Sequence, residues 1–200
     1  MACVTDTTLV IFGATGDLTS RLLLPALAQL LDREPGRTVH LLGAARRKLS
    51  DTQWRDLLKA GVGEGHGEAV DRLVADARYI VADPTDADDL KRVLDAVEGR
   101  PVFYFAVPPQ VAEAACEQLA GMDVPEGLTL ALEKPFGTDE ASARSLNETL
   151  RRVVPENQIF RVDHFLGRST VLNVLGLRFA NRLFEPAWSA EDVESVVIRF

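Results

Sequence analysis

The sequence has few cysteines and no long apolar run, and acidic residues outnumber basic ones. Its two cysteines, Cys3 and Cys116, are too few for a disulfide framework or a zinc site. No apolar run approaches the roughly 20 residues that span a bilayer. The N-terminus lacks the basic region and apolar core of a secretory signal. A net charge of −8 disfavours non-specific binding to nucleic acid. We therefore expect a cytoplasmic protein with no membrane or nucleic-acid partner.

What is present fits a globular protein. The chain has 200 residues, 46% hydrophobic and 26% charged, enough for one large domain or one domain and part of another. Short β-rich runs alternate with helical patterns about every 25–30 residues, which is typical of a doubly wound sheet. The runs are almost continuously apolar, as strands covered on both faces are. The expected strands are Leu9–Phe12, Thr38–Gly43, Arg78–Val81, Val102–Val107, Thr129–Leu132 and Gln158–Arg161. The predicted fold class is α/β, a Rossmann-like, doubly wound and mostly parallel sheet.

Helices are expected between these strands. The first is Ser20–Leu31, with Pro25 near its first turn, where a proline is best tolerated. Later helices are expected to end near Lys59, Val97, Ala120 and Val153. Three have a suitable capping residue before them, namely Ser50, Asp86 and Asp139. Gly61–Gly67 holds four glycines and is expected to be a loop.

The pattern changes after the sixth strand. Ser169–Ala180 has a helical pattern, Phe184–Trp188 is typical of a loop, and Val193–Phe200 alternates like a strand. A terminal strand without a partner cannot cover its edge or its apolar face. The sequence therefore predicts a Rossmann domain over residues 1–168 and the start of a truncated α+β domain over residues 169–200.

A glycine turn follows the first strand. Gly13 and Gly16 lie between the strand and an apolar helical pattern, where unpaired helical N–H groups and the helix dipole favour an anion. The spacing is G-x-x-G, shorter than the full G-x-G-x-x-G fingerprint. A dinucleotide pyrophosphate site and a purely structural turn therefore both remain open from this motif alone.

The end of the second strand indicates which dinucleotide is bound. An acidic residue there pairs with the ribose 2′-hydroxyl of NAD, whereas an arginine accommodates the 2′-phosphate of NADP. No acidic residue occurs between Val39 and Ser50, and Arg46, Arg47 and Lys48 follow the strand. A guanidinium can bind a phosphate through two hydrogen bonds. This position favours NADP, and a solvated basic turn is the alternative.

Catalytic groups in this fold cluster beyond the carboxyl ends of the strands. Three segments are candidates. Val107–Pro109 ends the fourth strand, beside the expected nicotinamide position, and Lys134 follows the fifth strand ahead of a Lys-Pro bond that could be cis. Asp163 and His164 follow the sixth strand, where neighbouring side chains point to opposite faces and so serve different partners. No histidines, cysteines or carboxylates occur at metal-ligand spacing, so no metal site is predicted.

Taken together, these segments resemble the glucose-6-phosphate dehydrogenase family. The resemblance extends over nearly the whole chain, and its longest run is highly specific. The matching runs are GATGDLTSRLLLPAL (13–27), GAARRKL (43–49), VFYFAVPP (102–109), LEKPFGTD (132–139), RVDHFLGRSTVLNVLGLRFANRLFEPAW (161–188) and VESVVIRF (193–200). It implies that the chain is the N-terminal portion of a protein more than twice as long, which would form homo-oligomers through its second domain.

The resemblance also implies a reaction and residue roles. Glucose 6-phosphate would be oxidised by NADP to 6-phosphoglucono-lactone. Lys134 would contact both substrate and coenzyme, His164 and Arg168 would bind the sugar phosphate, and Asp163 would orient the catalytic histidine. The residues implied in coenzyme binding are Gly13, Ala14, Thr15, Gly16, Asp17, Leu18, Thr19, Arg21, Arg46, Asp83, Pro84 and Lys134.

The chain departs from the family pattern at several positions. Phe165 replaces the usual tyrosine after the phosphate-binding histidine, Arg168 replaces a lysine, and Ser20 replaces a lysine of the glycine turn. The resemblance implies a catalytic histidine that lies further along, in the second domain. No histidine follows His164 in this chain, so that base would be missing from these 200 residues. Because a general base typically contributes about 10²–10⁴-fold, we expect little or no dehydrogenase activity from the chain alone.

Two other functions remain open. The chain could be a non-catalytic NADP-binding module, or part of a related sugar-phosphate dehydrogenase. A short-chain reductase is disfavoured because neither Tyr79 nor Tyr104 begins a Tyr-x-x-x-Lys pair.

Overall fold

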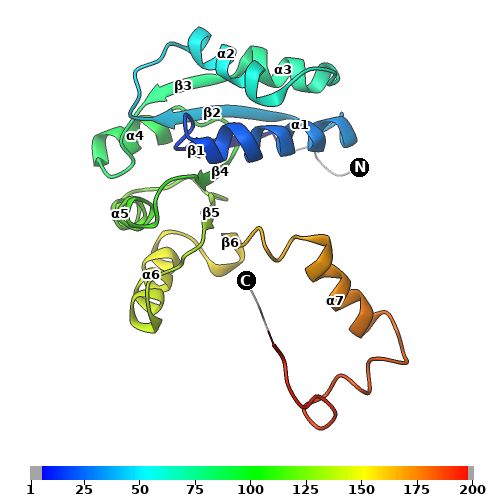
Figure 1. The fold of residues 1–200 in the computed structure, drawn as a ribbon. Coiled ribbons are helices and arrows are strands. Elements are labelled where there is room, and N and C mark those ends of the chain that lie inside the picture. Colours follow the sequence, from blue (N-terminus) through cyan, green and yellow to red (C-terminus); the bar gives the residue numbers. More distant parts are fainter. Residues whose placement is uncertain (1–5, 198–200) are drawn as a thin grey trace. The chain divides into compact units, whose positions relative to one another are not determined.

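The computed structural model describes residues 6–197, and the chain divides into two compact units, Met1–Val162 and Asp163–Phe200. The first unit contains a six-stranded sheet in the order β3-β2-β1-β4-β5-β6, and every pairing in it is parallel (Figure 1). The strands are β1 (Thr7–Phe12), β2 (Val39–Ala45), β3 (Arg78–Val81), β4 (Arg100–Phe105), β5 (Thr129–Glu133) and β6 (Ile159–Val162). The predicted α/β fold class is confirmed, and each predicted strand of this unit is present within two residues at either end.

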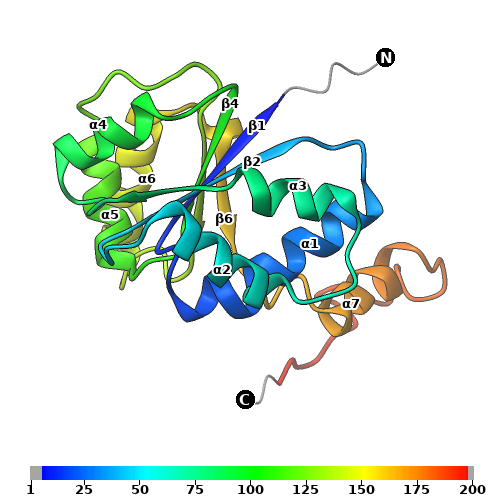
Figure 2. The ribbon, with the colours of Figure 1, turned by 90° about the horizontal axis from the view of Figure 1, so that it is seen from above.

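Helices cover both faces of the sheet (Figure 2). One face carries α1 (Leu24–Arg33), α2 (Asp51–Val62) and α3 (Glu68–Asp76). The other carries α4 (Ala87–Asp95), α5 (Pro109–Leu119) and α6 (Glu140–Val153). Strand order reverses between β1 and β4, the place where ligands bind in sheets of this class.

Alternation along β1 supplies both cores. Val10 and Phe12 belong to the cluster under α4, α5 and α6, whereas Ile11 belongs to the cluster under α1, α2 and α3. All three side chains are buried. Successive side chains of a strand point to opposite faces, so a central strand with helices on both sides is apolar at consecutive positions, as Val10, Ile11 and Phe12 are.

The three predicted capping residues begin their helices. The Ser50 hydroxyl accepts the Gln53 N–H at the start of α2, the Asp86 carboxylate accepts the Asp89 N–H before α4, and Asp139 caps α6. These helices therefore begin where the sequence predicts, because capping depends on residues only three positions apart.

Two local predictions need correction. The expected loop over Gly61–Gly67 is shorter, because α2 continues to Val62, and α3 follows directly from Gly67. The helix α3 was not predicted, because Gly67 offers no capping side chain. Its buried residues, Val70, Leu73 and Val74, are spaced as on an amphipathic helix, and this spacing was the available signal.

The helix after the glycine turn begins with a wider turn than expected. A π-helical segment, η1 (Thr19–Leu23), precedes α1, and the Leu24 N–H donates to the Thr19 carbonyl. Pro25 thus lies inside a longer helical segment rather than in its first turn. Because proline lacks an N–H and its ring crowds the carbonyl four residues earlier, a widened turn just before it relieves that contact.

The second unit contains α7 (Ser169–Phe179), followed by turns that include residues 184–188, as predicted. The strand predicted over Val193–Phe200 is not formed at residues 193–197, and residues 198–200 lie outside the described part. A strand needs a partner to pair its backbone groups, and the described part of this unit holds no other strand. Among residues 6–197, no helix is long and apolar enough to cross a membrane.

Candidate functional site

A cavity of about 460 Å³ lies at the carboxyl ends of four neighbouring strands. Its lining comes from the segments that follow β1, β2, β3 and β4 and from the start of α5. The lining residues are Gly13, Thr15, Gly16, Ala45, Arg46, Arg47, Asp83, Pro84, Thr85, Ala106, Val107, Pro108 and Val111. The structure therefore brings the glycine turn, the basic turn, the Asp83–Pro84 pair and part of the proline segment to one site, although they are far apart in sequence.

The glycine turn is held by backbone contacts that exclude a side chain. Gly13 has a φ of +82°, and a Cβ at this residue would lie 2.2 Å from the Ala106 carbonyl oxygen. The Gly13 N–H donates to Ala44 O at 2.9 Å, and the Gly16 N–H donates to Gly13 O at 2.8 Å. Both glycines thus line the cavity, but the close approach that requires Gly13 is to the end of β4.

The other residues of the segment from Ala14 to Arg21 that were expected to bind the coenzyme, apart from Thr15 and Gly16, lie outside the cavity lining. Ala14 and Thr19 are buried, and the Thr19 hydroxyl donates to the Gly13 carbonyl at 3.1 Å. Asp17 and Arg21 form an exposed ion pair of 3.2 Å. These residues, like Leu18, were expected at the coenzyme phosphates, but none of them lines the cavity.

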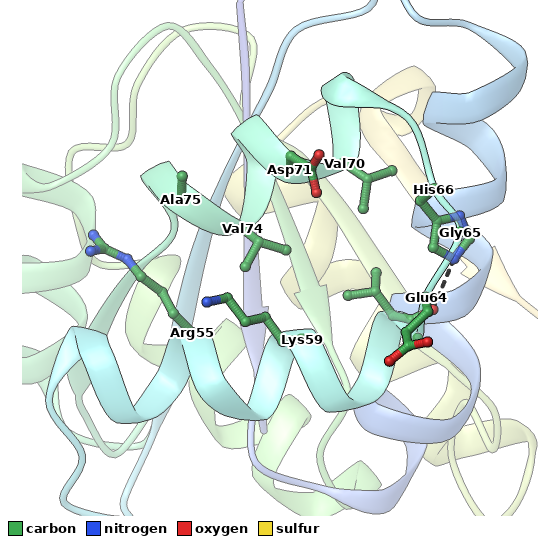
Figure 3. Close-up of a pocket in the computed structure, with 11 residues that line it drawn as sticks. Arg55, Lys59, Glu64, Gly65, His66, Val70, Asp71, Val74 and Ala75 are labelled. Atoms are coloured by element: carbon green, nitrogen blue, oxygen red, sulfur yellow. Dashed lines mark hydrogen bonds between the residues drawn. The ribbon is translucent and has the colours of Figure 1, made fainter.

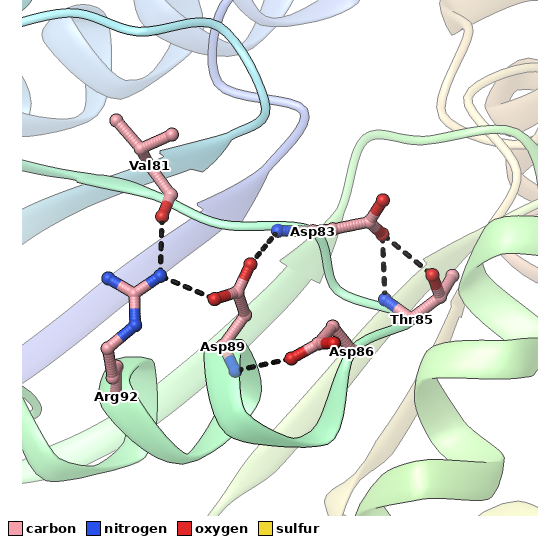
Figure 4. Close-up of polar contacts among 6 residues, drawn as sticks. All are labelled: Val81, Asp83, Thr85, Asp86, Asp89 and Arg92. Carbon is pink, nitrogen blue, oxygen red and sulfur yellow. Dashed lines mark hydrogen bonds and ion pairs between the residues drawn. The ribbon is translucent and has the colours of Figure 1, made fainter.

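A polar network fixes Asp83 at the rim of the cavity (Figure 4). Its Oδ1 accepts the Thr85 N–H at 3.0 Å and the Thr85 hydroxyl at 2.7 Å. Its own N–H donates to Asp89 Oδ2 at 2.8 Å, and Asp89 pairs with Arg92. The Thr85 N–H, then its hydroxyl and the charge of Arg46, lower the pKa of Asp83. The carboxylate is therefore charged and oriented at neutral pH.

Lys134 lies at the end of β5, at the same edge of the sheet. The Lys134–Pro135 peptide bond is cis, and the Lys134 N–H donates to Val162 O at 3.3 Å. Just before it, Glu133 accepts a hydrogen bond from the Tyr104 hydroxyl. Lys134 is exposed and does not line the 460 Å³ cavity.

The remaining predicted residues belong to the second unit. The Asp163 Oδ1 accepts the Phe165 N–H at 3.0 Å, and the Gly167 N–H donates to His164 O at 3.2 Å. These bonds form a compact turn that begins at Asp163, directly after β6, and ends at Arg168, which precedes α7. Within residues 6–197, no group of three or more His, Cys, Asp or Glu side chains could hold a metal ion.

Comparison with known proteins identifies the family. Residues 10–173 match the family model described as "Glucose-6-phosphate dehydrogenase, NAD binding domain". The chain belongs to the glucose-6-phosphate dehydrogenase family. The resemblance noted in the sequence is thereby confirmed, and the description of the matched domain supports a nicotinamide dinucleotide as its ligand.

Individual family members show the same relation. The chain is 38% identical to glucose-6-phosphate 1-dehydrogenase 2 of Mycobacterium tuberculosis, over 95% of this chain and 41% of that protein. It is 40% identical to the glucose-6-phosphate 1-dehydrogenase of Gluconobacter oxydans, over 94% of this chain and 42% of that protein. The chain thus spans about two fifths of the length of these glucose-6-phosphate dehydrogenases.

Solved structures of the family have the same fold. The crystal structure of glucose-6-phosphate 1-dehydrogenase from Mycobacterium avium matches with a TM-score of 0.77 and 36% identity, over 94% of this chain and 43% of that one. The structure of a glucose-6-phosphate dehydrogenase in complex with its substrate glucose-6-phosphate matches with a TM-score of 0.76 and 31% identity. This match covers 96% of this chain and 43% of that one.

A second, larger hollow of about 780 Å³ lies between α2, α3 and the loop that joins them (Figure 3). Arg55 and Lys59 point from α2 toward α3, and Val70 and Val74 form part of the opposite wall. None of the residues that the sequence assigned to the dehydrogenase site lines this hollow. The smaller cavity, at the strand ends, is therefore the candidate coenzyme site.

Two residues that shape the site are not indicated by the sequence analysis, Thr85 and Tyr79. For Thr85 the available signal is Asp83, because an aspartate side chain commonly accepts the N–H of the residue two positions later. Tyr79 was considered only as part of a reductase motif, yet its hydroxyl donates to the Arg47 carbonyl beside the cavity. No pattern within one segment reveals this contact, because it joins β3 to the end of β2.

Proposed function

We propose that this chain is the coenzyme-binding part of an NADP-dependent glucose-6-phosphate dehydrogenase. The observation that carries the proposal is the cavity itself, because it joins the glycine turn to Arg46 at the end of β2. No acidic residue lies between Val39 and Ser50, where the ribose 2′-position of a dinucleotide is expected.

The residues present fit this coenzyme. Arg46 and Arg47 both line the cavity, and a guanidinium suits a phosphate in charge and in hydrogen-bond geometry. The Thr15 hydroxyl and the glycine turn offer polar groups to the pyrophosphate. Asp83 is suited to accept hydrogen bonds from ribose hydroxyl groups, since its Oδ2 has no hydrogen-bond partner among the described residues. Bound NADP would supply a hydride acceptor.

In the whole protein, we propose oxidation of glucose 6-phosphate at its C1 hydroxyl to 6-phosphoglucono-lactone. Lys134 would contact substrate and coenzyme, His164 and Arg168 would bind the sugar phosphate, and Asp163 would orient a catalytic histidine. We also propose that the whole protein is a cytoplasmic homo-oligomer.

The coenzyme assignment is tested by titrating NADP and NAD into the chain and into Arg46→Ala. Loss of hydrogen bonds to a charged phosphate should weaken NADP binding about ten- to hundredfold, and NAD binding by less than about threefold. Arg37→Ala is the control, because Arg37 pairs with Glu34 at 2.6 Å and does not line the cavity. An equal loss of affinity for both nucleotides would contradict a contact to the 2′-phosphate.

The missing base leads to a separate expectation. With no histidine after His164, the 200-residue chain should bind NADP yet turn over glucose 6-phosphate at least about 100-fold more slowly than a full-length family member. An assay of NADPH formation measures this. Turnover near that of a full-length enzyme would show that the base lies within this chain.

A second candidate function is a non-catalytic NADP-binding module. The exposed Phe165 favours it, because a phenyl ring cannot donate the hydrogen bond to the sugar phosphate that a tyrosine would. A related sugar-phosphate dehydrogenase is favoured by the same change. These functions are distinguished by assaying the whole protein with glucose 6-phosphate and with other sugar phosphates. Turnover of glucose 6-phosphate supports the proposed dehydrogenase, and turnover of another sugar phosphate alone indicates the related dehydrogenase. No turnover of any of them indicates a non-catalytic NADP-binding module.

A further inference from the structure

Tyr79 connects the two ends of the basic turn that follows β2. Its ring is buried in β3, and its hydroxyl donates to the Arg47 carbonyl at 2.7 Å and lies 3.3 Å from the Ala45 carbonyl. These two carbonyls flank Arg46 in sequence. The hydroxyl therefore contacts the backbone on both sides of Arg46, within a segment, Ala45–Arg47, that lines the cavity.

The backbone of Tyr79 holds the other end of the turn. Its N–H donates to Asp51 Oδ1 at 2.7 Å, and Asp51 is the first residue of α2. Ser50 is fixed by its reciprocal hydrogen bonds with Gln53. One residue of β3 thus ties down the segment from Ala45 to Asp51 at its start and at its end.

The tyrosine ring is itself fixed by packing. Its centroid lies 5.5 Å from that of the Trp54 ring, and the two ring planes are inclined at 44°. The Trp54 ring in turn packs against Gly43, where a Cβ would lie 2.7 Å from it. Burial raises the pKa of the Tyr79 hydroxyl above its ordinary value of 10, so the hydroxyl stays protonated even at mildly alkaline pH. The donor therefore has one position relative to the turn.

We propose that Tyr79 is a positioning residue that sets the preference for NADP over NAD by fixing the backbone on either side of Arg46. A guanidinium on a loose turn must lose conformational entropy when it binds a phosphate, whereas a fixed turn has already lost it. NAD has no 2′-phosphate, so its affinity should not depend on this order. The inference rests on the proposed coenzyme site and adds to it a residue outside the cavity lining.

The first test is Tyr79→Phe, which keeps the ring and removes the hydroxyl. Losing one hydrogen bond of this kind should raise the dissociation constant for NADP about two- to tenfold and leave that for NAD within about twofold. A purely structural role would weaken both nucleotides equally, and that result, or no change in either, would overturn the proposal.

A double-mutant cycle with Arg46→Ala supplies the second readout. If Tyr79 acts through Arg46, adding Tyr79→Phe to Arg46→Ala should cause no further loss of NADP affinity. An additive loss would contradict the proposal. If Arg46→Ala alone leaves NADP binding unchanged, the proposed coenzyme site fails instead, so the two failures are distinguishable.

A third variant covers the case in which Tyr79→Phe does not fold. Asp51→Ala removes the acceptor at the opposite end of the turn and leaves the tyrosine hydroxyl in place. It should also lower the NADP-to-NAD preference selectively. An unchanged preference in a folded Asp51→Ala protein would show that anchoring the turn has no effect on the choice between NADP and NAD, and would overturn the proposal.

Discussion

At the residue scale, Gly13 shows how a nucleotide-binding motif can be required by the protein's own packing. Its φ of +82° is disfavoured for other residues, and a Cβ would lie 2.2 Å from a carbonyl oxygen of Ala106. Gly13→Ala should therefore lower the free energy of unfolding by at least about 2 kcal/mol without any nucleotide present. Urea denaturation followed by circular dichroism measures this change.

Gly36 provides the matched control for that substitution. Nothing lies within 4 Å of a Cβ built at Gly36, so Gly36→Ala should change stability by less than about 0.5 kcal/mol. If Gly13→Ala instead kept its stability and lost only nucleotide affinity, the glycine would be needed for the approach of the phosphate alone. The change in stability thus measures the structural role of the turn, and nucleotide titration of the same variant measures its role in binding.

At the element scale, His66 joins α1 to the loop between α2 and α3. Its Nδ1 lies 2.6 Å from Asp32 Oδ2, and its Nε2 lies 2.9 Å from the Val62 carbonyl oxygen. Both ring nitrogens thus face acceptors, and only the doubly protonated ring donates to both. The hydrogen bond to Asp32, then that to Val62, raises the pKa of His66 above its ordinary value of 6.5, and Asp71 adds a weaker attraction.

This link predicts a pH-dependent stability. Because the pKa of His66 is raised on folding, its contribution is complete below pH 6.5 and is lost as the pH rises through the raised value. The pKa of Asp32 is lowered, chiefly by the Gly67 N–H, so its contribution is present above pH 3.8 and lost at lower pH. The difference in Tm between the protein and His66→Ala should therefore be larger at pH 6 than at pH 9.

Asp32→Asn tests the cause of that difference. With the carboxylate removed, substituting His66 should no longer have a markedly pH-dependent effect on the Tm. A Tm difference for His66→Ala that stays constant from pH 6 to pH 9 would mean that the ring does not donate to both acceptors.

The sequence predicted elements well where the signal is local. Ser50, Asp86 and Asp139 begin their helices as expected, because each cap acts on an N–H three residues away. The strand expected from Val193 is absent at residues 193–197, because alternation alone supplies no pairing partner. The same distinction holds in the site: Arg46 was found from its place after a strand, whereas Tyr79 acts through a contact between two strands.

At the scale of the whole molecule, the two units differ in what they bury. In residues 6–197, every buried residue lies at or before Ile159, so the first unit builds its core from its own residues. In the second unit α7 has no buried residue, and Leu172, Leu175 and Phe179 are half exposed or more. Contiguous exposed apolar side chains of this kind are typical of surfaces that associate with other protein surfaces.

These differences predict the result of a truncation. A version of the chain that ends at Val162 keeps all six strands and should retain its Tm within about 3 °C, with unchanged NADP affinity. Because it lacks the exposed apolar side chains of α7, it should also bind less of a hydrophobic dye than the 200-residue chain does. A version that ends at Asn157 loses β6 and buried Ile159, and should melt at least about 5 °C lower. If the version ending at Val162 had a Tm as low as that of the version ending at Asn157, the first unit would depend on residues beyond β6. A coenzyme domain that ends near that strand would then be excluded.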